Sequence, residues 1–203
     1  MFLIDLPCVS DSLERSLAAS RSPVVATAAA RRLLAGAAVN WIEEDQAAAR
    51  LAGAAPPRLH TNSENALGWL AERLPRSELQ RWAGLCKDKL RFREATRPLH
   101  PELEFRGLGL AELDGLDLAR LPMPFVIKPA AGFFSLGVHR VRSPEAWPAA
   151  RDALRAELAA ARRLFPRSVF DAERLIVEQV IDGAEVAVDA DLDDRGEPVV
   201  LNI

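Results

Sequence analysis

A lone lysine inside an apolar segment is the first residue whose type and setting suggest chemistry. Lys128 lies in Pro124–Val141, PFVIKPAAGFFSLGVHRV, and only three of the 26 basic residues of the chain are lysine. An ammonium on a flexible stem suits a single phosphate oxygen, whereas the planar fork of arginine is harder to fit into a tight pocket. Gly132, Ser135 and Gly137 follow, and they allow backbone N–H groups to approach an anion. The segment therefore predicts a strand, a loop and a second strand that close over a phosphate.

The loop itself is not a P-loop. Gly132 to Gly137 match the GxxxxG half of that motif, but Val138 and His139 stand where Lys and Ser or Thr are required. A strand is also predicted after the loop, whereas a P-loop opens a helix. The phosphate must then be bound by another architecture.

Two further features lie before and after the hairpin, and a third lies inside it. Lys89 follows Asp88 at the start of a predicted helix, and Lys128 stands in the run Val126–Pro129, VIKP. Downstream, the run Glu178–Glu185, EQVIDGAE, has an acid, an apolar pair, a glycine and a second acid. A carboxylate at the second acid suits a vicinal diol, because it accepts two hydrogen bonds. A competing explanation for Lys89 is that it lies with Lys87 on an exposed helix face. A competing explanation for Glu178 and Glu185 is that they point outward from a strand.

These residues, in this order, resemble the ATP-grasp superfamily of carboxylate-activating ligases, over about residues 86–203. The resemblance implies that two subdomains hold ATP between them. It implies that Lys89 and Lys128 bind phosphates and that the lid, residues 131–137 with Gly132, Ser135 and Gly137, covers them. It further implies that Glu178 and the backbone of Gln179 and Val180 bind adenine, and that Glu185 binds ribose. The adjacent Phe133 and Phe134 depart from the smaller residues that many relatives carry in the lid.

The implied activity is ATP-dependent ligation. ATP would activate a substrate carboxylate as an acyl phosphate, which an amine or thiol attacks; an amino acid or small peptide is the expected substrate. The family's magnesium ligands lie on strands after the point where this sequence stops, so we expect Mg²⁺ only with a C-terminal part, and this chain alone to be inactive. Two alternatives stay open: a non-catalytic nucleotide-binding or regulatory module, and an α/β interaction domain.

The fold class predicted is α/β, with two domains. Residues 1–85 form a Rossmann-like unit with a parallel sheet, because strands alternate with helices. Residues 86–203 form an α+β ATP-grasp small subdomain and the start of a second subdomain.

Local patterns predict the helices and strands of each unit. In the first unit they predict strands at Phe2–Leu6, Pro23–Thr27 and Arg58–His60. They also predict helices that begin at Asp11, Thr61 and Ser77, and helices that cover 28–34 and Trp41–Leu51. In the second they predict a helix over Lys87–Thr96, strands at 124–129 and 137–142, a helix after Ser143, and strands at Leu175–Val180, Val186–Asp191 and Pro198–Ile203; residues 102–122 show only weak periodicity.

Bulk properties narrow the partners. The formal net charge is −3, and no basic run interleaved with aromatic residues appears, which argues against nucleic acid as a partner. No apolar run approaches the length of about 18 residues that a membrane span needs. Cys8 and Cys86 cannot make a disulfide framework, and the N-terminus lacks the basic flank of a signal peptide, so we expect a cytoplasmic protein. The sequence leaves homo-oligomerisation open.

Overall fold

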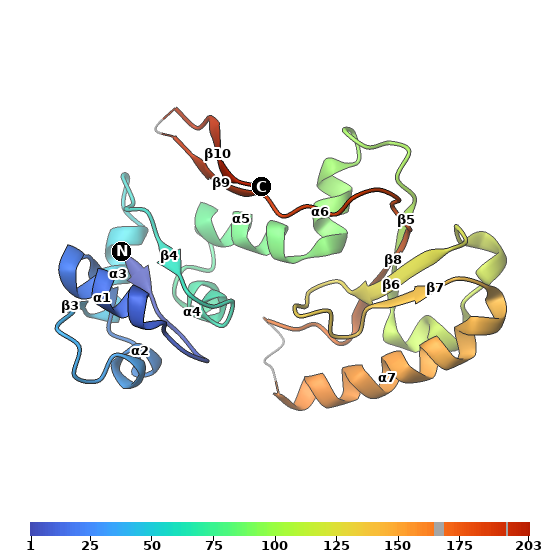
Figure 1. The fold of residues 1–203 in the computed structure, drawn as a ribbon, viewed down its shortest axis with the longest axis horizontal. Helices are drawn as coiled ribbons and strands as arrows, with labels where there is room; N and C mark the ends of the chain where they lie inside the picture. Colours follow the sequence, from blue (N-terminus) through green and yellow to red (C-terminus); the bar gives the residue numbers. More distant parts are fainter. Residues whose placement is uncertain (165–168, 194) are drawn as a thin grey trace.

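The protein has an α/β architecture in two lobes joined by a pair of helices (Figure 1). The structure is a computed structural model and describes residues 1–164, 169–193 and 195–203. The first lobe contains a four-stranded parallel sheet with strand order β3-β2-β1-β4. Its strands are β1 (Phe2–Leu3), β2 (Pro23–Val25), β3 (Asn40–Ile42) and β4 (His60–Thr61). Its helices are α1 (Asp11–Ser20), α2 (Ala28–Leu33), α3 (Glu44–Leu51) and α4 (Ala66–Arg73).

Helices cover both faces of this sheet, because successive strand residues point to opposite sides. On one face Leu3 and Val25 pack with Leu51 of α3 and Leu70 of α4. On the other face their neighbours pack against α1 and α2, in a cluster made of Ile4, Leu17, Val24, Ala30 and Leu34. The predicted parallel sheet of a Rossmann-like unit is therefore confirmed.

Two helices connect the lobes. α5 (Glu78–Lys87) is capped by Ser77, whose hydroxyl accepts the Gln80 N–H at 3.1 Å, as the spacing of these residues predicts. α6 (Lys89–Thr96) follows after the single residue Asp88. The predicted boundary at residue 85 thus falls inside α5, and the division into two domains stays a prediction.

The second lobe is an antiparallel sheet with strand order β5-β8-β6-β7, built from β5 (Phe105–Gly109), β8 (Arg174–Gln179), β6 (Phe125–Pro129) and β7 (His139–Val141). Two 3₁₀ segments, Leu110–Gly115 and Leu118–Arg120, lie between β5 and β6. The long helix α7 (Trp147–Leu164), preceded by the 3₁₀ turn Pro144–Ala146, packs one apolar face against this sheet. Trp147, Leu154 and Leu158 of that face are buried against Phe125 and Val177.

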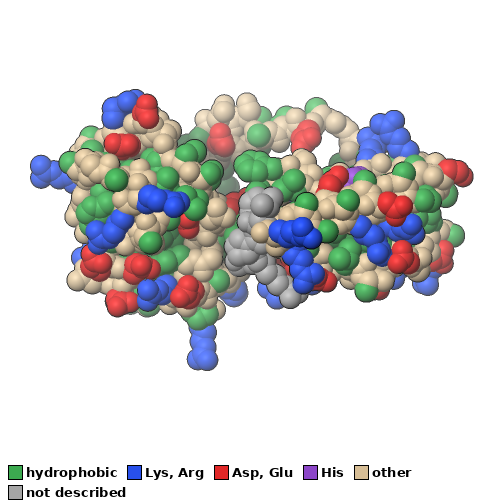
Figure 2. Space-filling model, turned by 90° about the horizontal axis from the view of Figure 1, so that it is seen from below, with side chains coloured by type: hydrophobic (Ala, Val, Ile, Leu, Met, Phe, Trp, Pro, Cys, Tyr) green, Lys and Arg blue, Asp and Glu red, His purple; other side chains and the backbone are tan. Residues whose placement is uncertain are grey.

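The last described segment is an antiparallel hairpin of β9 (Asp189–Leu192) and β10 (Pro198–Asn202), as predicted. Asp194 of its predicted turn lies outside the described residues, as does the side chain of Leu164 on the apolar face predicted for α7. The hairpin reaches back over α5 toward the first lobe (Figure 1), where the Arg58 guanidinium contacts the Asp191 carboxylate at 3.2 Å. Seen from below, both lobes carry charged side chains of both signs, without a large patch of one sign (Figure 2).

Several local predictions were wrong. The run Trp41–Leu51 is not one helix: β3 occupies its beginning and α3 starts only at Glu44. No strand was predicted within residues 102–122, but β5 lies there. It is a strand because it pairs with β8, which is far along the chain. The helix predicted to open at Thr61 begins only at Ala66, because the Thr61 hydroxyl donates to the Ser63 carbonyl instead of capping a helix. Helix α1 begins at Asp11 as predicted, and Ser10 caps it.

Candidate nucleotide site

Asp88 fixes the start of α6 and so positions Lys89. Its Oδ1 accepts the backbone N–H groups of Leu90 and Arg91, both at 3.1 Å, which caps the helix. The Lys89 backbone N–H in turn donates to the Ala130 carbonyl at 2.7 Å. The helix carrying one predicted phosphate lysine is thereby fastened to the end of the strand carrying the other.

The Asp88 side chain is itself braced from the sheet. The Arg174 guanidinium of β8 forms ion pairs with both Asp88 and Asp171. Burial alone would raise the pKa of Asp88, but its hydrogen bond to Arg174 and the capped N–H groups hold that pKa below its usual value. The carboxylate therefore stays charged at neutral pH, which keeps the helix start in place.

Lys128 and Glu178 face each other across two neighbouring strands. Val126 of β6 lies opposite Glu178 of β8, so Lys128, two residues along β6, shares a face with it as a diagonal neighbour. The Lys128 ammonium forms an ion pair with Glu178 Oε1, while Arg93 Nε donates to Oε2 at 3.0 Å. Glu178 is 5% exposed. Its pKa, which burial alone would raise, is held below the usual value by Lys128 and then by Arg93.

Lys89 completes the cluster from the opposite side. Its ammonium donates to the Gly132 carbonyl at 3.1 Å, at the beginning of the lid. Burial and the positive charge of Lys128 lower the pKa of Lys89, against the pull of Glu178 and Asp88. Two ammonium groups held this close to each other and to a glycine-containing loop form a site that a polyanion would stabilise.

Lid residues divide into two groups. Gly132 lies in the cluster, and Gly137, with φ +70°, donates its N–H to Glu157 at 3.0 Å at the base of the lid. Ser135 and Phe134 form the exposed tip, with φ values of +55° and +51°. The structure thus brings Gly132 into contact with Lys89 but leaves Ser135 exposed.

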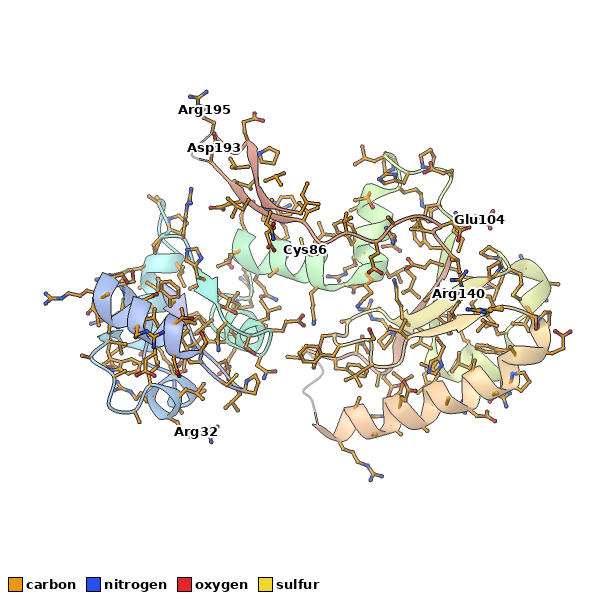
Figure 3. All side chains as sticks on the ribbon, in the orientation of Figure 1. Arg32, Cys86, Glu104, Arg140, Asp193 and Arg195 are labelled. Atoms are coloured by element: carbon orange, nitrogen blue, oxygen red, sulfur yellow. The ribbon has the colours of Figure 1, made fainter. Side chains whose placement is uncertain are left out.

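The predicted adenine and ribose residues lie apart from the lysines, except Glu178. The Gln179 N–H donates to the carbonyl of Glu104, which Figure 3 labels, at 2.9 Å, and the Val180 N–H donates to the Pro124 carbonyl at 3.4 Å. Because both N–H groups already donate hydrogen bonds, the adenine contacts predicted for Gln179 and Val180 would have to be made by their backbone carbonyl groups. Glu185 is exposed in the segment between β8 and β9.

Arg93 is the functional candidate that sequence reasoning missed. It lies four residues after Lys89 on α6, so the two side chains share a helix face, and that spacing was the available signal. Lys87 was also misread: its side chain is only 12% exposed, not part of an open helix face.

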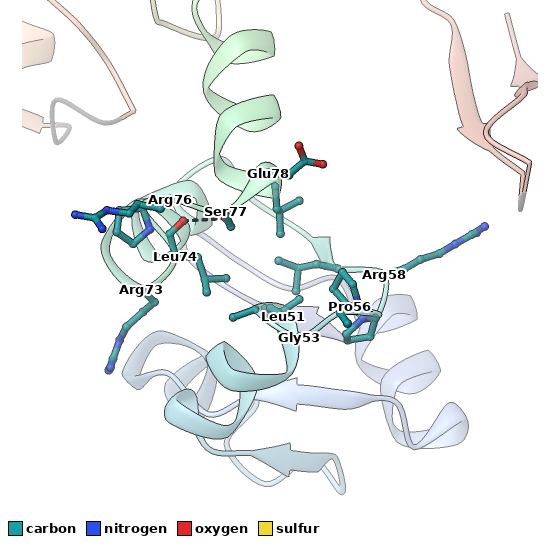
Figure 4. A pocket seen from close by; sticks show the side chains of 15 residues that line it. Leu51, Gly53, Pro56, Arg58, Arg73, Leu74, Arg76, Ser77 and Glu78 are labelled. Carbon is teal, nitrogen blue, oxygen red and sulfur yellow. Dashed lines mark hydrogen bonds between the residues drawn. The ribbon is translucent and has the colours of Figure 1, made fainter.

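Neither a metal-ligating group nor a large hollow coincides with this cluster in the described part of the chain. In the described ranges, no group of three or more His, Cys, Asp or Glu side chains is placed to hold a metal ion. A hollow of about 740 Å³ lies instead in the first lobe, between the end of α3 and the α4–α5 turn, lined by residues such as Leu51, Arg58 and Arg76 (Figure 4). None of its lining residues was predicted as a site residue. No described helix is long and apolar enough to cross a membrane.

Part of the chain matches the model of a known protein family. Residues 121–203 match the model of the ATP-grasp domain. The resemblance to the ATP-grasp superfamily is confirmed over these residues. The matched ATP-grasp segment holds Lys128, the lid and Glu178, whereas Lys89 and Arg93 come from the helix before it.

Among solved structures, the chain is similar to an L-amino acid ligase from Bacillus licheniformis, with 21% identity and a TM-score of 0.63. That likeness covers 98% of this chain, so it includes both lobes, but only 50% of the ligase. It establishes the fold. A D-alanine-D-alanine ligase from Helicobacter pylori is also similar, with 20% identity and a TM-score of 0.41, over 70% of this chain and 41% of that one. Comparison with curated proteins found no match.

Proposed function

We propose that this chain provides the nucleotide-binding part of an ATP-dependent ligase that joins a carboxylate to an amine or thiol. The observation that carries the proposal is the convergence of Lys89, Lys128 and the Gly132 backbone, from a helix, a strand and a loop that the fold fastens together. The Glu178 carboxylate contacts the Lys128 ammonium, and the Gly132 carbonyl accepts a hydrogen bond from the Lys89 ammonium. Phosphate oxygens would replace those acceptors, because they offer more negative charge to both lysines.

In the proposed reaction, a carboxylate oxygen of the substrate attacks the γ-phosphorus of ATP and ADP leaves. The amine or thiol then attacks the acyl carbon and releases phosphate. Lys89 and Lys128 would neutralise the charge of the triphosphate, and the lid would exclude water. Glu178 and the backbone at Gln179 and Val180 would bind adenine, and Glu185 would bind the ribose hydroxyls.

Magnesium belongs to the proposed reaction, where it would shield the triphosphate. The described side chains do not fit a magnesium site, since they offer no cluster of three or more ligands. The substrate class we propose is an amino acid or a small peptide acid, which fits the ligase of similar fold. A cytoplasmic location is part of the same proposal.

The proposal is tested by calorimetric titration of ATP into the wild type and Lys128→Ala. Removing one phosphate ligand should weaken ATP binding at least about tenfold, which is the loss of one charge-assisted contact. Arg140→Ala is the matched control, since Arg140 is an exposed cation on the same hairpin, and we expect it to bind like the wild type. Absence of binding in the wild type, or equal binding by Lys128→Ala, would overturn the proposal.

A further inference from the structure

Of the three lysines of the chain, Lys87 is the one that the proposed function does not use. It is the last residue of α5, and its ammonium group is buried. That ammonium forms an ion pair with Glu64 and lies 5.2 Å from the centroid of the Phe133 ring. One buried charge therefore contacts a carboxylate on one side and an aromatic face on the other.

The two partners belong to different parts of the molecule. Glu64 lies between β4 and α4, at the carboxyl end of the parallel sheet of the first lobe. Phe133 is a lid residue, and the β6–β7 loop that contains it extends toward α4 and α5 (Figure 1). Lys87 is thus the point where the first lobe, the connecting helices and the lid meet.

The Phe133 ring also has an aromatic neighbour. Phe133 packs edge-on against Phe170, with centroids 6.5 Å apart and an interplanar angle of 87°. The Phe133 ring therefore has a cation and an aromatic ring as neighbours. Contacts between a cation and an aromatic ring are strongest where water is excluded.

We propose that Lys87 is a lid-positioning residue, through which Glu64 of the first lobe holds the lid over the nucleotide site. That the lid covers a nucleotide rests on the proposed function, whereas the contacts of Lys87 with Glu64 and Phe133 do not. Lys87 contacts no nucleotide in this scheme and acts through Phe133. A change in the first lobe at Glu64 would then alter ATP affinity without touching the phosphate lysines.

Two charged groups face Lys87 from the elements around it: Glu64 from the β4–α4 segment and Lys89 from α6. Burial, and secondly the charge of Lys89, lower the pKa of Lys87 to about 8. The ammonium is therefore mostly charged at pH 7 and loses its charge as the pH rises through about 8. The hold on the lid should weaken over the same interval.

Two measurements on the purified protein test this role. Hydrogen exchange of the lid amides should be about threefold or more faster in Lys87→Met than in the wild type, and Lys87→Arg should restore the slow exchange. ATP affinity should fall about three- to tenfold in Lys87→Met and Glu64→Gln. Lys87→Arg should bind ATP with the wild-type affinity at pH 7. Between pH 7 and pH 9 the ATP affinity of the wild type should fall as Lys87 loses its charge, whereas Lys87→Arg keeps its charge and should not show this fall.

Arg81→Met is the matched control. Arg81 lies on the same helix, pairs with Glu78 at 2.9 Å and stacks over Trp82 at 4.6 Å, but it is exposed and away from the lid. It should change neither measurement. Unchanged lid exchange in Lys87→Met would overturn the inference. If the wild type binds no ATP, the proposed function fails, while the exchange comparison still decides whether Lys87 positions the lid.

Discussion

At the residue scale, the Glu178 carboxylate neutralises two cations at once and keeps Lys128 pointed into the site. Glu178→Gln would leave Lys128 and Arg93 without their shared anion in a largely buried setting. We expect it to lower the free energy of unfolding at pH 7 by about 2 kcal/mol, as measured by urea denaturation. Glu94→Gln, at an exposed position on α6, is the control and should change stability little.

The pH dependence of this effect has a fixed sign. Because the folded-state pKa of Glu178 lies below its unfolded value, its stabilisation is present above the unfolded pKa and is lost as the pH falls through the folded one. The stability difference between wild type and Glu178→Gln should therefore be largest near neutral pH and shrink below about pH 4.5. A difference that stays constant down to pH 3 would contradict the assigned ion pairs.

Sequence patterns singled out the two lysines that we propose bind phosphate, but not the side chains that contact them. Lys128 stood out because lysine is rare in this chain. Arg93 did not stand out, because arginine is common here and its partner Glu178 lies on a strand far along the chain. A residue's own type could be read from the sequence, while its ion-pair partner required the tertiary fold.

At the element scale, the base of the lid depends on a glycine. Gly137 has φ +70°, and a Cβ there would lie 3.2 Å from both Leu158 and Pro129. Gly137→Ala should lower the free energy of unfolding by about 1–2 kcal/mol. Gly84→Ala in α5 has open space around the new methyl group, and it should instead raise the free energy by about 0.5–1 kcal/mol. Urea denaturation of both variants tests the opposite signs, and a stabilised Gly137→Ala would contradict the described lid.

Elements with local signals were predicted well, and elements defined by distant pairing were not. The β6–β7 hairpin and the capped helix α5 have their determinants in a few adjacent residues. β3 is three residues long and runs almost directly into α3, so helix-type patterning masked it. β5 exists through its ladder with β8, which no local pattern reports.

At the scale of the whole molecule, α5 and α6 connect a lobe with a parallel sheet to a lobe with an antiparallel sheet, and the two lobes meet at the lid. The order of the two lobes followed from the sequence, because alternating strands and helices give way to a hairpin and one long helix. The Glu64–Lys87 contact between them did not, since nothing local links a residue after β4 with the end of α5.

The central claim is that ATP phosphates lie between Lys89 and Lys128. The most direct test is affinity labelling with an ATP derivative that carries an acyl phosphate, which binds like ATP and transfers its acyl group to a nearby amine. Because the chain has three lysines, mass spectrometry of the labelled peptides assigns every modified side chain. We predict acylation at Lys89 or Lys128 that excess ATP suppresses. Acylation confined to Lys87 and the N-terminal amine, or acylation that ATP does not suppress, would contradict the account.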